Sequence, residues 1–448
     1  MEPTRPPLVL IEGGAGVAAS GPSLLPAAEL AALGAGLTLS VSLMARLPSW
    51  ARALGSFQAL FALAFVFFAL AVMRLPRYLA VPRAGLLIFA VALATRAALL
   101  PVAPALSQDI ARYVWEGRVI VHGGNPYRQS PADTALAPLR DRVIWPRVNH
   151  PELSTIYPPL AEAGFALVAR MAPGVPPMKL WIVLHDLALV AVLMLWSAQR
   201  GGSVVPAIAY AWNPLVLIEY AGNGHNDPTA MVWLALALWL ADSRPTLSAL
   251  ALAAGALVKL APLVALPFLV ARWSTRARLA CCIVLIPGLA WFWSETRSTY
   301  SGLVAYWGTW RNNELIFHYL EQWTGHFQAA RALGLAACAA LVLYALARRF
   351  DPARGTRAVM RAAALTSPVL HPWYLGWTLM FEPLAPSAPW LLLSLTVILN
   401  YGWFTAPGDA GGFHLPLSGR WVEYGIPLLL GLGLAIRGWL TARARRPA

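Results

Sequence analysis

Charged residues are scarce in this chain of 448 residues: they account for 12% of it, whereas hydrophobic residues account for 58%. No polar stretch is long enough to form a separate domain, so the composition excludes a protein built from two or three soluble domains. Instead, apolar runs of about 17–25 residues recur, the length that crosses a hydrocarbon core of roughly 30 Å. The sequence therefore predicts a polytopic integral membrane protein with a single membrane domain over residues 1–448.

Cysteine is also rare, and its placement excludes two kinds of site. Three cysteines lie in apolar segments, with neither the spacing of metal ligands nor that of a disulfide framework: Cys281, Cys282 and Cys338. The N-terminus lacks a basic region followed by a short apolar core and a cleavage site, so we expect no removable signal peptide. The glycine-rich stretch at 13–16 lacks the surroundings of a phosphate-binding loop, and we interpret it as a linker.

Positive charge is plentiful but confined to a few places. The formal net charge is +14, which in a soluble protein would suggest nucleic-acid binding. The arginines gather in short loops, as the positive-inside rule describes for cytoplasmic loops. The clusters are Arg74, Arg77 and Arg83; Arg272, Arg276 and Arg278; Arg348, Arg349, Arg354 and Arg357; and Arg443, Arg445 and Arg446. The charge therefore indicates membrane topology, and we expect no nucleic-acid partner.

The arginine clusters also orient the chain. If they face the cytoplasm, residues 105–156 form a large external loop, which we predict to be catalytic, and 296–327 form a second external loop. The apolar stretch at 157–173 does not fit this count, because a crossing there would turn every later arginine cluster outward. We interpret it as a re-entrant or juxtamembrane helix. The predicted fold class is an all-α bundle of about 13–14 transmembrane helices with external juxtamembrane helices.

A polar helix is predicted where the third hydrophobic segment ends, in the stretch ALSQDIARYVWEGRVIVHGGNPY at 105–127. Ser107 can cap a helix that begins at Gln108, and the helix dipole favours the negative charge of Asp109 in the first turn. Three further side chains at i+3, i+4 and i+7 share its face of the helix: Arg112, Tyr113 and Glu116. An ionised carboxylate at the outer surface suits a general base. The alternative is a capping aspartate in an amphipathic interfacial helix.

Two further polar clusters fall on the same external side. The turn YAGNGHNDPTA at 220–230 carries four polar residues between apolar helices: Asn223, His225, Asn226 and Asp227. Helix capping ahead of Pro228 accounts for one or two of them and does not explain His225. His371 precedes Pro372 at the outer end of a short helix pair. A lone histidine is often a satisfied structural residue, but the position beside the other clusters favours a functional one.

Other residues keep further interpretations open. Lys259 lies among apolar residues, where a charge is costly and indicates function unless the side chain snorkels to the interface. Four ionisable residues lie in other apolar segments: Arg96, His185, Asp186 and Glu219. Arg96, Asp186 and Glu219 are compatible with a secondary transporter. The aromatic-rich segment 291–323 can stack on sugar rings or form an interfacial aromatic belt.

Five motifs, in this order, resemble the GT-C superfamily of membrane glycosyltransferases: SQDIARYVWEGR…GGNPY, IYPP, NP…GNGHND, LVKLAPLVALPF and HPWYLGW. The likeness spans roughly residues 85–385 and is strongest to the bacterial and mycobacterial polyprenyl-phosphomannose-dependent α-mannosyltransferases. The resemblance implies a GT-C-like fold and a polyprenyl-phosphate sugar as donor, with mannose as the expected sugar. It also implies an inverting transfer without metal or cofactor, in the cytoplasmic membrane, at a site that faces the periplasm or exterior.

The resemblance assigns roles to individual residues. Asp109 matches the catalytic aspartate, which takes the proton of an acceptor hydroxyl as general base. His371 and Lys259 match basic residues that hold the lipid phosphate, and Arg112 is a further candidate. Candidates for binding the sugar or the acceptor lie in the same motifs: Tyr113, Glu116, Asn125, Tyr127, Tyr157, Asn223, His225, Asn226, Asp227, Trp373 and Tyr374. The expected partners are a polyprenyl-phosphate sugar, a glycan or glycolipid acceptor and the lipid bilayer.

Two other functions stay open. A secondary transporter would carry polar residues near the membrane midplane on paired halves, but no internal repeat is evident in the sequence. A lipid-linked glycan ligase or flippase shares the donor lipid, although a ligase would use a diphosphate-linked glycan. The identity of the donor therefore separates these alternatives.

Overall fold

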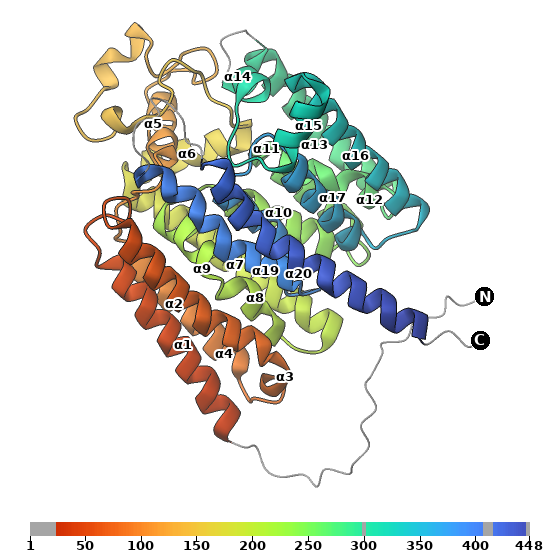
Figure 1. The fold of residues 1–448 in the computed structure, drawn as a ribbon. Coiled ribbons are helices and arrows are strands. Elements are labelled where there is room, and N and C mark those ends of the chain that lie inside the picture. Colours follow the sequence, from red (N-terminus) through yellow and green to blue (C-terminus); the bar gives the residue numbers. More distant parts are fainter. Residues whose placement is uncertain (1–23, 298–301, 406–414, 445–448) are drawn as a thin grey trace.

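The computed structural model describes residues 24–297, 302–405 and 415–444, and Figure 1 shows them as an assembly of helices. Within these ranges no β-strand occurs, and an isolated β-bridge joins Asn312 to Val369. The predicted all-α fold is therefore confirmed. The expected linker at 13–16 lies outside the described residues, as does the rest of the N-terminal stretch on which the absence of a signal peptide was predicted.

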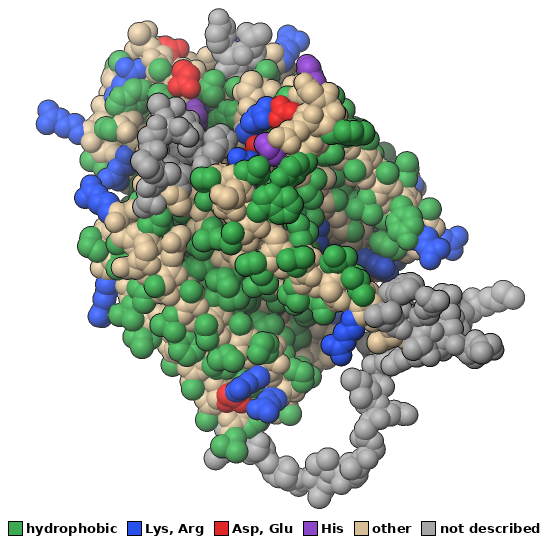
Figure 2. Space-filling view, in the orientation of Figure 1, with side chains coloured by type: hydrophobic (Ala, Val, Ile, Leu, Met, Phe, Trp, Pro, Cys, Tyr) green, Lys and Arg blue, Asp and Glu red, His purple; other side chains and the backbone are tan. Residues whose placement is uncertain are grey.

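Five helices in the described part of the chain are long and apolar enough to cross a membrane. They are α1 (Leu24–Ala45), α2 (Leu54–Met73), α7 (Val175–Gly201), α13 (Thr275–Thr296) and α16 (Phe327–Ala347). Figure 2 shows hydrophobic side chains over most of the central face of the molecule and charged side chains mainly toward its edges. The polytopic membrane architecture is confirmed, although these long helices are fewer than the roughly 13–14 spans expected.

The remaining apolar segments form shorter or interrupted helices. They are α3 (Leu75–Tyr78), α4 (Ala84–Leu99), α5 (Asp109–Val121), α6 (Pro159–Met171), α8 (Ile208–Ala211), α9 (Pro214–Val216), α10 (Pro228–Trp239), α11 (Pro245–Val258), α12 (Leu266–Val270), α14 (Gly302–Thr309), α15 (Ile316–Thr324), α17 (Pro352–Thr366), α18 (Gly376–Leu379) and α19 (Ala388–Thr396). The long helix α20 (Leu417–Ala444) follows them. Tighter 3-10 turns connect several of these: η1 (Thr134–Leu139), η2 (Trp145–Arg147), η3 (Val205–Ala207), η5 (Ala261–Ala265), η6 (Pro372–Leu375) and η7 (Val397–Thr405).

Proline explains why one expected span is broken. The apolar run at 204–221 contains Pro206 and Pro214, which lack the N–H that a continuous helix requires. The run therefore folds as η3, α8 and α9, and it ends in the π-helical turn η4 (Leu217–Gly222). Turns of this kind are rare and often found at functional sites. Here the turn carries Glu219, which contacts His225.

Helices α3, α5 and α7 identify the two ends of the bundle. Helix α5 lies at one end and α3, with its neighbouring arginines, at the other (Figure 1). Helix α3 contacts η3, and Arg200 just before η3 pairs with Asp351, so these loops share the arginine end. At the other end, the ammonium of Lys179 near the start of α7 donates to the carbonyls of Leu99 and Val102 at 2.8 and 2.7 Å. Helix α7 therefore runs from the Asp109 end to the arginine end.

Helix α6, within the stretch predicted to be re-entrant or juxtamembrane, has 13 residues. At 1.5 Å per residue its length is about 20 Å, below the roughly 30 Å of a hydrocarbon core. It packs on α5 at Gly117, where an added Cβ would lie 2.3 Å from the carbonyl oxygen of Phe165. Both the loop before α6 and the start of α7 lie at the Asp109 end. These observations support the predicted placement, which itself stays a prediction.

Buried charges inside the bundle pair with each other. Nε of Arg96 lies 2.7 Å from Oδ2 of Asp186, and neither side chain is exposed. The hydroxyl of Tyr210 donates to the other Asp186 oxygen at 2.8 Å, and Arg96 also donates to the carbonyls of Ala92 and Ala211. Two of the groups that made a transporter conceivable are therefore paired with each other inside the bundle.

Candidate active site

Asp109 is the first residue of α5, so the helix begins one residue later than predicted. Gln108 is the N-cap, and the Ser107 hydroxyl accepts the backbone N–H of Asp109 at 3.2 Å. The Asp109 side chain is 24% exposed. Its Oδ1 accepts a hydrogen bond from the Asn149 amide at 2.8 Å. One carboxylate oxygen is therefore fixed by the protein, while the group as a whole stays accessible, as a general base requires.

Three segments far apart in the sequence meet at Asp109. Nε2 of His225 lies 3.9 Å from Oδ2 of Asp109. The His225 ring stacks on Trp373, with 3.7 Å between ring centroids, and Trp373 stacks on His371 at 4.2 Å. Gly224 makes this possible, because its φ of 78° suits the turn and a Cβ there would clash with Ile110 of α5. The structure therefore brings the three polar motifs into one site.

Lys259 follows α11, and its side chain is 22% exposed. Its ammonium pairs with the Asp227 carboxylate, which also accepts a hydrogen bond from the Trp377 indole at 2.7 Å. The ammonium lies 5.1 Å from the centre of the Tyr374 ring, a distance at which a cation attracts an aromatic face. The Tyr374 hydroxyl contacts that of Tyr306 at 3.0 Å. Lys259 thus sits at the site with its charge already balanced by Asp227.

His371 lies in the segment between α17 and η6. Burial, with His225 and Lys259 nearby, lowers the pKa of His371 to about 3. Its imidazole is therefore neutral near pH 7 and can donate or accept one hydrogen bond at each nitrogen. Any contact with a phosphate would be a hydrogen bond from a neutral ring.

Arg112 was predicted to bind the donor phosphate, and in the structure its guanidinium contacts Glu116 and a neighbouring loop. Its guanidinium pairs with Glu116, one helical turn along α5. Its other nitrogens donate to the carbonyls of Asn149, His150 and Leu153. All three guanidinium nitrogens are therefore occupied, because a charge buried at 8% exposure needs partners inside the protein. These contacts hold the loop that carries Asn149, and the predicted contact of Arg112 with the donor phosphate stays a prediction.

Glu116, Tyr113 and Tyr157 are buried and make packing contacts between α5 and α6, and their predicted contact with sugar or acceptor stays a prediction. Glu116 lies beside the buried Glu162 of α6, and this neighbour adds to burial in raising the pKa of Glu162 well above its usual range. The Tyr113 ring stacks on Phe165 at 4.9 Å, and the hydroxyl of Tyr157 donates to that of Tyr113 at 3.2 Å. These contacts fix α5 on α6.

Asn125 and Tyr127 connect the loop after α5 to other elements. The Asn125 amide donates to Glu295 of α13 at 3.2 Å, and the same carboxylate accepts two hydrogen bonds from Arg128. The Tyr127 hydroxyl donates to the carbonyl of Tyr157 at 2.9 Å. The structure shows anchoring contacts for both residues, and their predicted contact with sugar or acceptor stays a prediction.

The comparisons with known proteins bear on the activity. A family model described as alpha-(1->6)-mannopyranosyltransferase, N-terminal domain, matches residues 16–275, more than half of the chain. The chain belongs to this family. A search of curated proteins and a search of solved structures found no match. The family confirms the resemblance to the membrane α-mannosyltransferases and supports glycosyltransferase activity.

The residues matched by the mannosyltransferase family include Asp109, the turn at 220–230 and Lys259. His371, Trp373 and Tyr374 lie beyond them. The stacking of His225 on Trp373 therefore joins the matched part of this mannosyltransferase to its C-terminal part. A site built from both parts explains why the motifs are so widely spaced in the sequence.

Sequence reasoning missed three contributors to the site. Asn149 carried no signal, because an asparagine in a loop is common, and Trp377, the last residue of the motif HPWYLGW, was not singled out from it. Glu219 has one signal in the sequence, which is its position as an acidic residue in an apolar run. It was not included in the predicted site. Its place beside His225, with Nδ1 and Oε2 3.1 Å apart, became evident only from the packing of η4.

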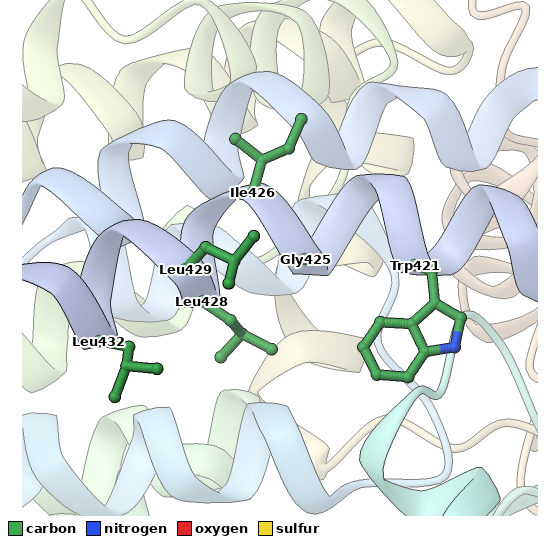
Figure 3. A pocket seen from close by; sticks show the side chains of 6 residues that line it. All are labelled: Trp421, Gly425, Ile426, Leu428, Leu429 and Leu432. Atoms are coloured by element: carbon green, nitrogen blue, oxygen red, sulfur yellow. The ribbon is translucent and has the colours of Figure 1, made fainter.

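Two hollows lie outside the Asp109 contacts. A cavity of about 220 Å³ between α6, α7, α10 and α11 borders Asn226, and mainly apolar side chains such as Trp181 and Trp233 line it. Such walls suit an isoprenoid chain better than a sugar ring. A groove of about 360 Å³ along α20 is lined by Trp421, Gly425, Ile426, Leu428, Leu429 and Leu432 (Figure 3). None of these six is a predicted site residue, so we do not place the reaction there.

Proposed function

We propose that this mannosyltransferase-family protein transfers mannose from a polyprenyl-phosphate donor to a hydroxyl of a glycan or glycolipid. Asp109 acts as the general base, the configuration at the sugar inverts, and no metal or cofactor takes part. The observation that carries the proposal is the accessible Asp109 carboxylate, which lies where three polar segments converge at one end of a membrane bundle.

A single displacement accounts for the reaction. The acceptor oxygen attacks the anomeric carbon as Asp109 removes its proton, and the bond between that carbon and the phosphate oxygen breaks. The electron pair of the broken bond leaves with the phosphate, which needs no protonating acid. One carboxylate therefore suffices, whereas glycoside hydrolases require two. Attack from the side opposite the leaving phosphate inverts the configuration.

The donor phosphate is placed on the side of the site that carries Lys259 and His371. The ammonium of Lys259 can turn from Asp227 toward a phosphate, and the neutral His371 ring can donate one hydrogen bond. Electrostatic stabilisation of the charge gained by the leaving phosphate is the usual large contribution to such a transfer. The indole of Trp377 keeps Asp227 hydrogen-bonded when Lys259 moves.

The orientation in the membrane follows from the arginine clusters. We place the arginine end in the cytoplasm and the Asp109 end in the periplasm or exterior, in the cytoplasmic membrane. Support comes from α7, which joins the two ends and separates Lys179 from Arg200. A site on the outer side can meet both a lipid-borne donor and an envelope glycan.

Incubation of the purified protein with synthetic donors tests the proposed function. We expect transfer of mannose from polyprenyl phosphomannose to a sugar acceptor, and much slower transfer of glucose from polyprenyl phosphoglucose. Product formation is measured by mass spectrometry in the presence of a metal chelator. Transfer from a diphosphate-linked glycan instead would favour a ligase, and an absence of transfer from every polyprenyl donor would overturn the proposal.

Lys259→Gln should raise the donor KM by about 10–100-fold, because a hydrogen bond to a charged group contributes about 1.5–3 kcal/mol. His371→Asn should raise it by a smaller factor, since the ring is neutral. Lys259→Arg keeps the charge and should lose less than Lys259→Gln. The exposed His122→Asn is the matched control for His371. Unchanged donor kinetics in both Lys259→Gln and His371→Asn would remove the phosphate from this position.

A further inference from the structure

His225 is held between two carboxylates. Its Nδ1 lies 3.1 Å from both the backbone carbonyl oxygen and the side-chain Oε2 of Glu219. Its Nε2 lies 3.9 Å from Oδ2 of Asp109. The ring has no exposed surface, and within the described residues Nε2 has no hydrogen-bond partner. A buried polar nitrogen without a partner calls for an explanation, and here the atom faces the carboxylate assigned as the base.

Both carboxylate oxygens of Glu219 accept hydrogen bonds. Its Oε1 accepts a hydrogen bond from the Tyr401 hydroxyl at 2.8 Å, and its Oε2 accepts one from the Asn223 amide at 3.1 Å. Nδ1 of His225 is the third donor. An ionised carboxylate is an acceptor only, and this set of partners suits that form. Since both atoms that face Nδ1 are acceptors, Nδ1 carries a proton.

The His225 ring lies among groups that attract positive charge. Carboxylates lie at both of its nitrogens, and the face of Trp373 stacks on the ring at 3.7 Å, an arrangement that attracts cations. The other charged groups in the site weaken this attraction for a positive charge only a little. Lys259 is balanced by Asp227, and His371 is neutral. Among the contacts of Asp109, His225 is therefore the group that can present a positive charge.

We propose that Glu219 and His225 are positioning residues for the base: Glu219 holds the His225 ring, and the ring directs Oδ2 of Asp109 through its Nε2. Asn149 fixes the other oxygen, so the carboxylate is held from both sides in one orientation. A shift of about 1 Å would turn the contact of 3.9 Å into a hydrogen bond. This inference rests on the proposed function, because it requires Asp109 to be the base.

The role differs from sugar binding, which is the other task predicted for His225. A residue that contacts the sugar changes the KM of donor or acceptor when it is removed, whereas a residue that acts through Asp109 changes kcat. Glu219 sharpens the distinction, because it is 1% exposed and sits on the far side of His225 from Asp109. An effect of Glu219 on kcat without an effect on KM has no explanation in substrate contact.

The test compares His225→Gln and Glu219→Gln with wild type in the full-length protein, using polyprenyl phosphomannose and a sugar acceptor. We expect kcat to fall by about 10–100-fold in both variants, the scale of a misplaced catalytic group. Both KM values should stay within about twofold. The exposed matched controls His122→Gln and Glu152→Gln should keep the wild-type kcat. Thermal unfolding midpoints show whether each variant is folded, and kcat is calculated per folded protein.

Three outcomes overturn the inference. A raised KM with unchanged kcat would make His225 a substrate-binding residue, and a loss explained fully by unfolded protein would make the pair structural. Wild-type kinetics in both variants would leave the pair without a role. Asp109→Asn measured in parallel separates these results from a failure of the proposed function. If Asp109→Asn is inactive while His225→Gln and Glu219→Gln are unaffected, only the positioning role is wrong; if Asp109→Asn is active, the assigned base is wrong.

Discussion

Asp109→Asn is expected to lower the rate of sugar transfer by about 10²–10⁴-fold, the usual contribution of general acid–base catalysis. The substitution preserves the size of the side chain, and the new amide oxygen can still accept the hydrogen bond that Asn149 donates at 2.8 Å. If Asp109 only stabilised the start of α5, the loss of charge would cost about 1 kcal/mol or less. Initial rates with saturating donor, measured on protein that elutes as a single folded species, distinguish the two roles.

Two companion variants make the Asp109 result specific. Asp109→Glu keeps the charge but moves it by one methylene, so it should also lose activity through misplacement. The matched control is Glu152→Gln in the same external segment, because Glu152 is 63% exposed. Glu116→Gln is a poor control, since Glu116 pairs with the buried Arg112. A near wild-type rate for Asp109→Asn would show that α5 is merely an interfacial helix.

Asp186→Asn is expected to destabilise the bundle by about 3–5 kcal/mol, because it leaves the buried charge of Arg96 without its partner. Both side chains are completely buried, and Nε of Arg96 lies 2.7 Å from the Asp186 carboxylate. The predicted effect is on folding and not on chemistry. The thermal unfolding midpoint in detergent should fall markedly, while the activity per folded molecule at low temperature stays near that of wild type.

A double variant tests whether the bundle needs the ion pair itself or only side chains that fill the same buried space. Arg96→Met with Asp186→Leu replaces both charges by apolar groups, and such replacements of buried ion pairs are often neutral or stabilising. The double variant should therefore be more stable than Asp186→Asn alone. Loss of activity at full stability in either variant would instead give the pair a functional role and reopen the transporter alternative.

The fold class could be predicted from the sequence because it depends on properties that can be read directly from the order of residues. The length of an apolar run and the placement of arginine are one-dimensional properties, and the bilayer makes them decisive. The sequence was less informative about how many helices cross without interruption. Proline in the run at 204–221 breaks the expected span, and the π-helical turn that follows depends on the helices packed around it.

Residues that stand out chemically against an apolar background could also be found in advance. Asp109, His225, Lys259 and His371 were each conspicuous because a charged or titratable group beside a membrane segment is expensive unless it has a task. The structure shows that all four lie in one connected set of contacts. Arg112 was conspicuous for the same reason, and in the structure its guanidinium donates hydrogen bonds to the loop from 149 to 153.

From the sequence alone follow the all-α membrane fold, a polar helix that begins near Asp109 and the motifs of an α-mannosyltransferase family. Which polar groups touch became evident only from the packing of the bundle. The contact of 3.9 Å between His225 and Asp109 joins residues 116 positions apart (225 minus 109), and Glu219 reaches that pair through η4. Helical spacing predicts neighbours within one helix. Contacts between helices depend instead on how side chains of the whole bundle fill space, and no short stretch of sequence contains that information.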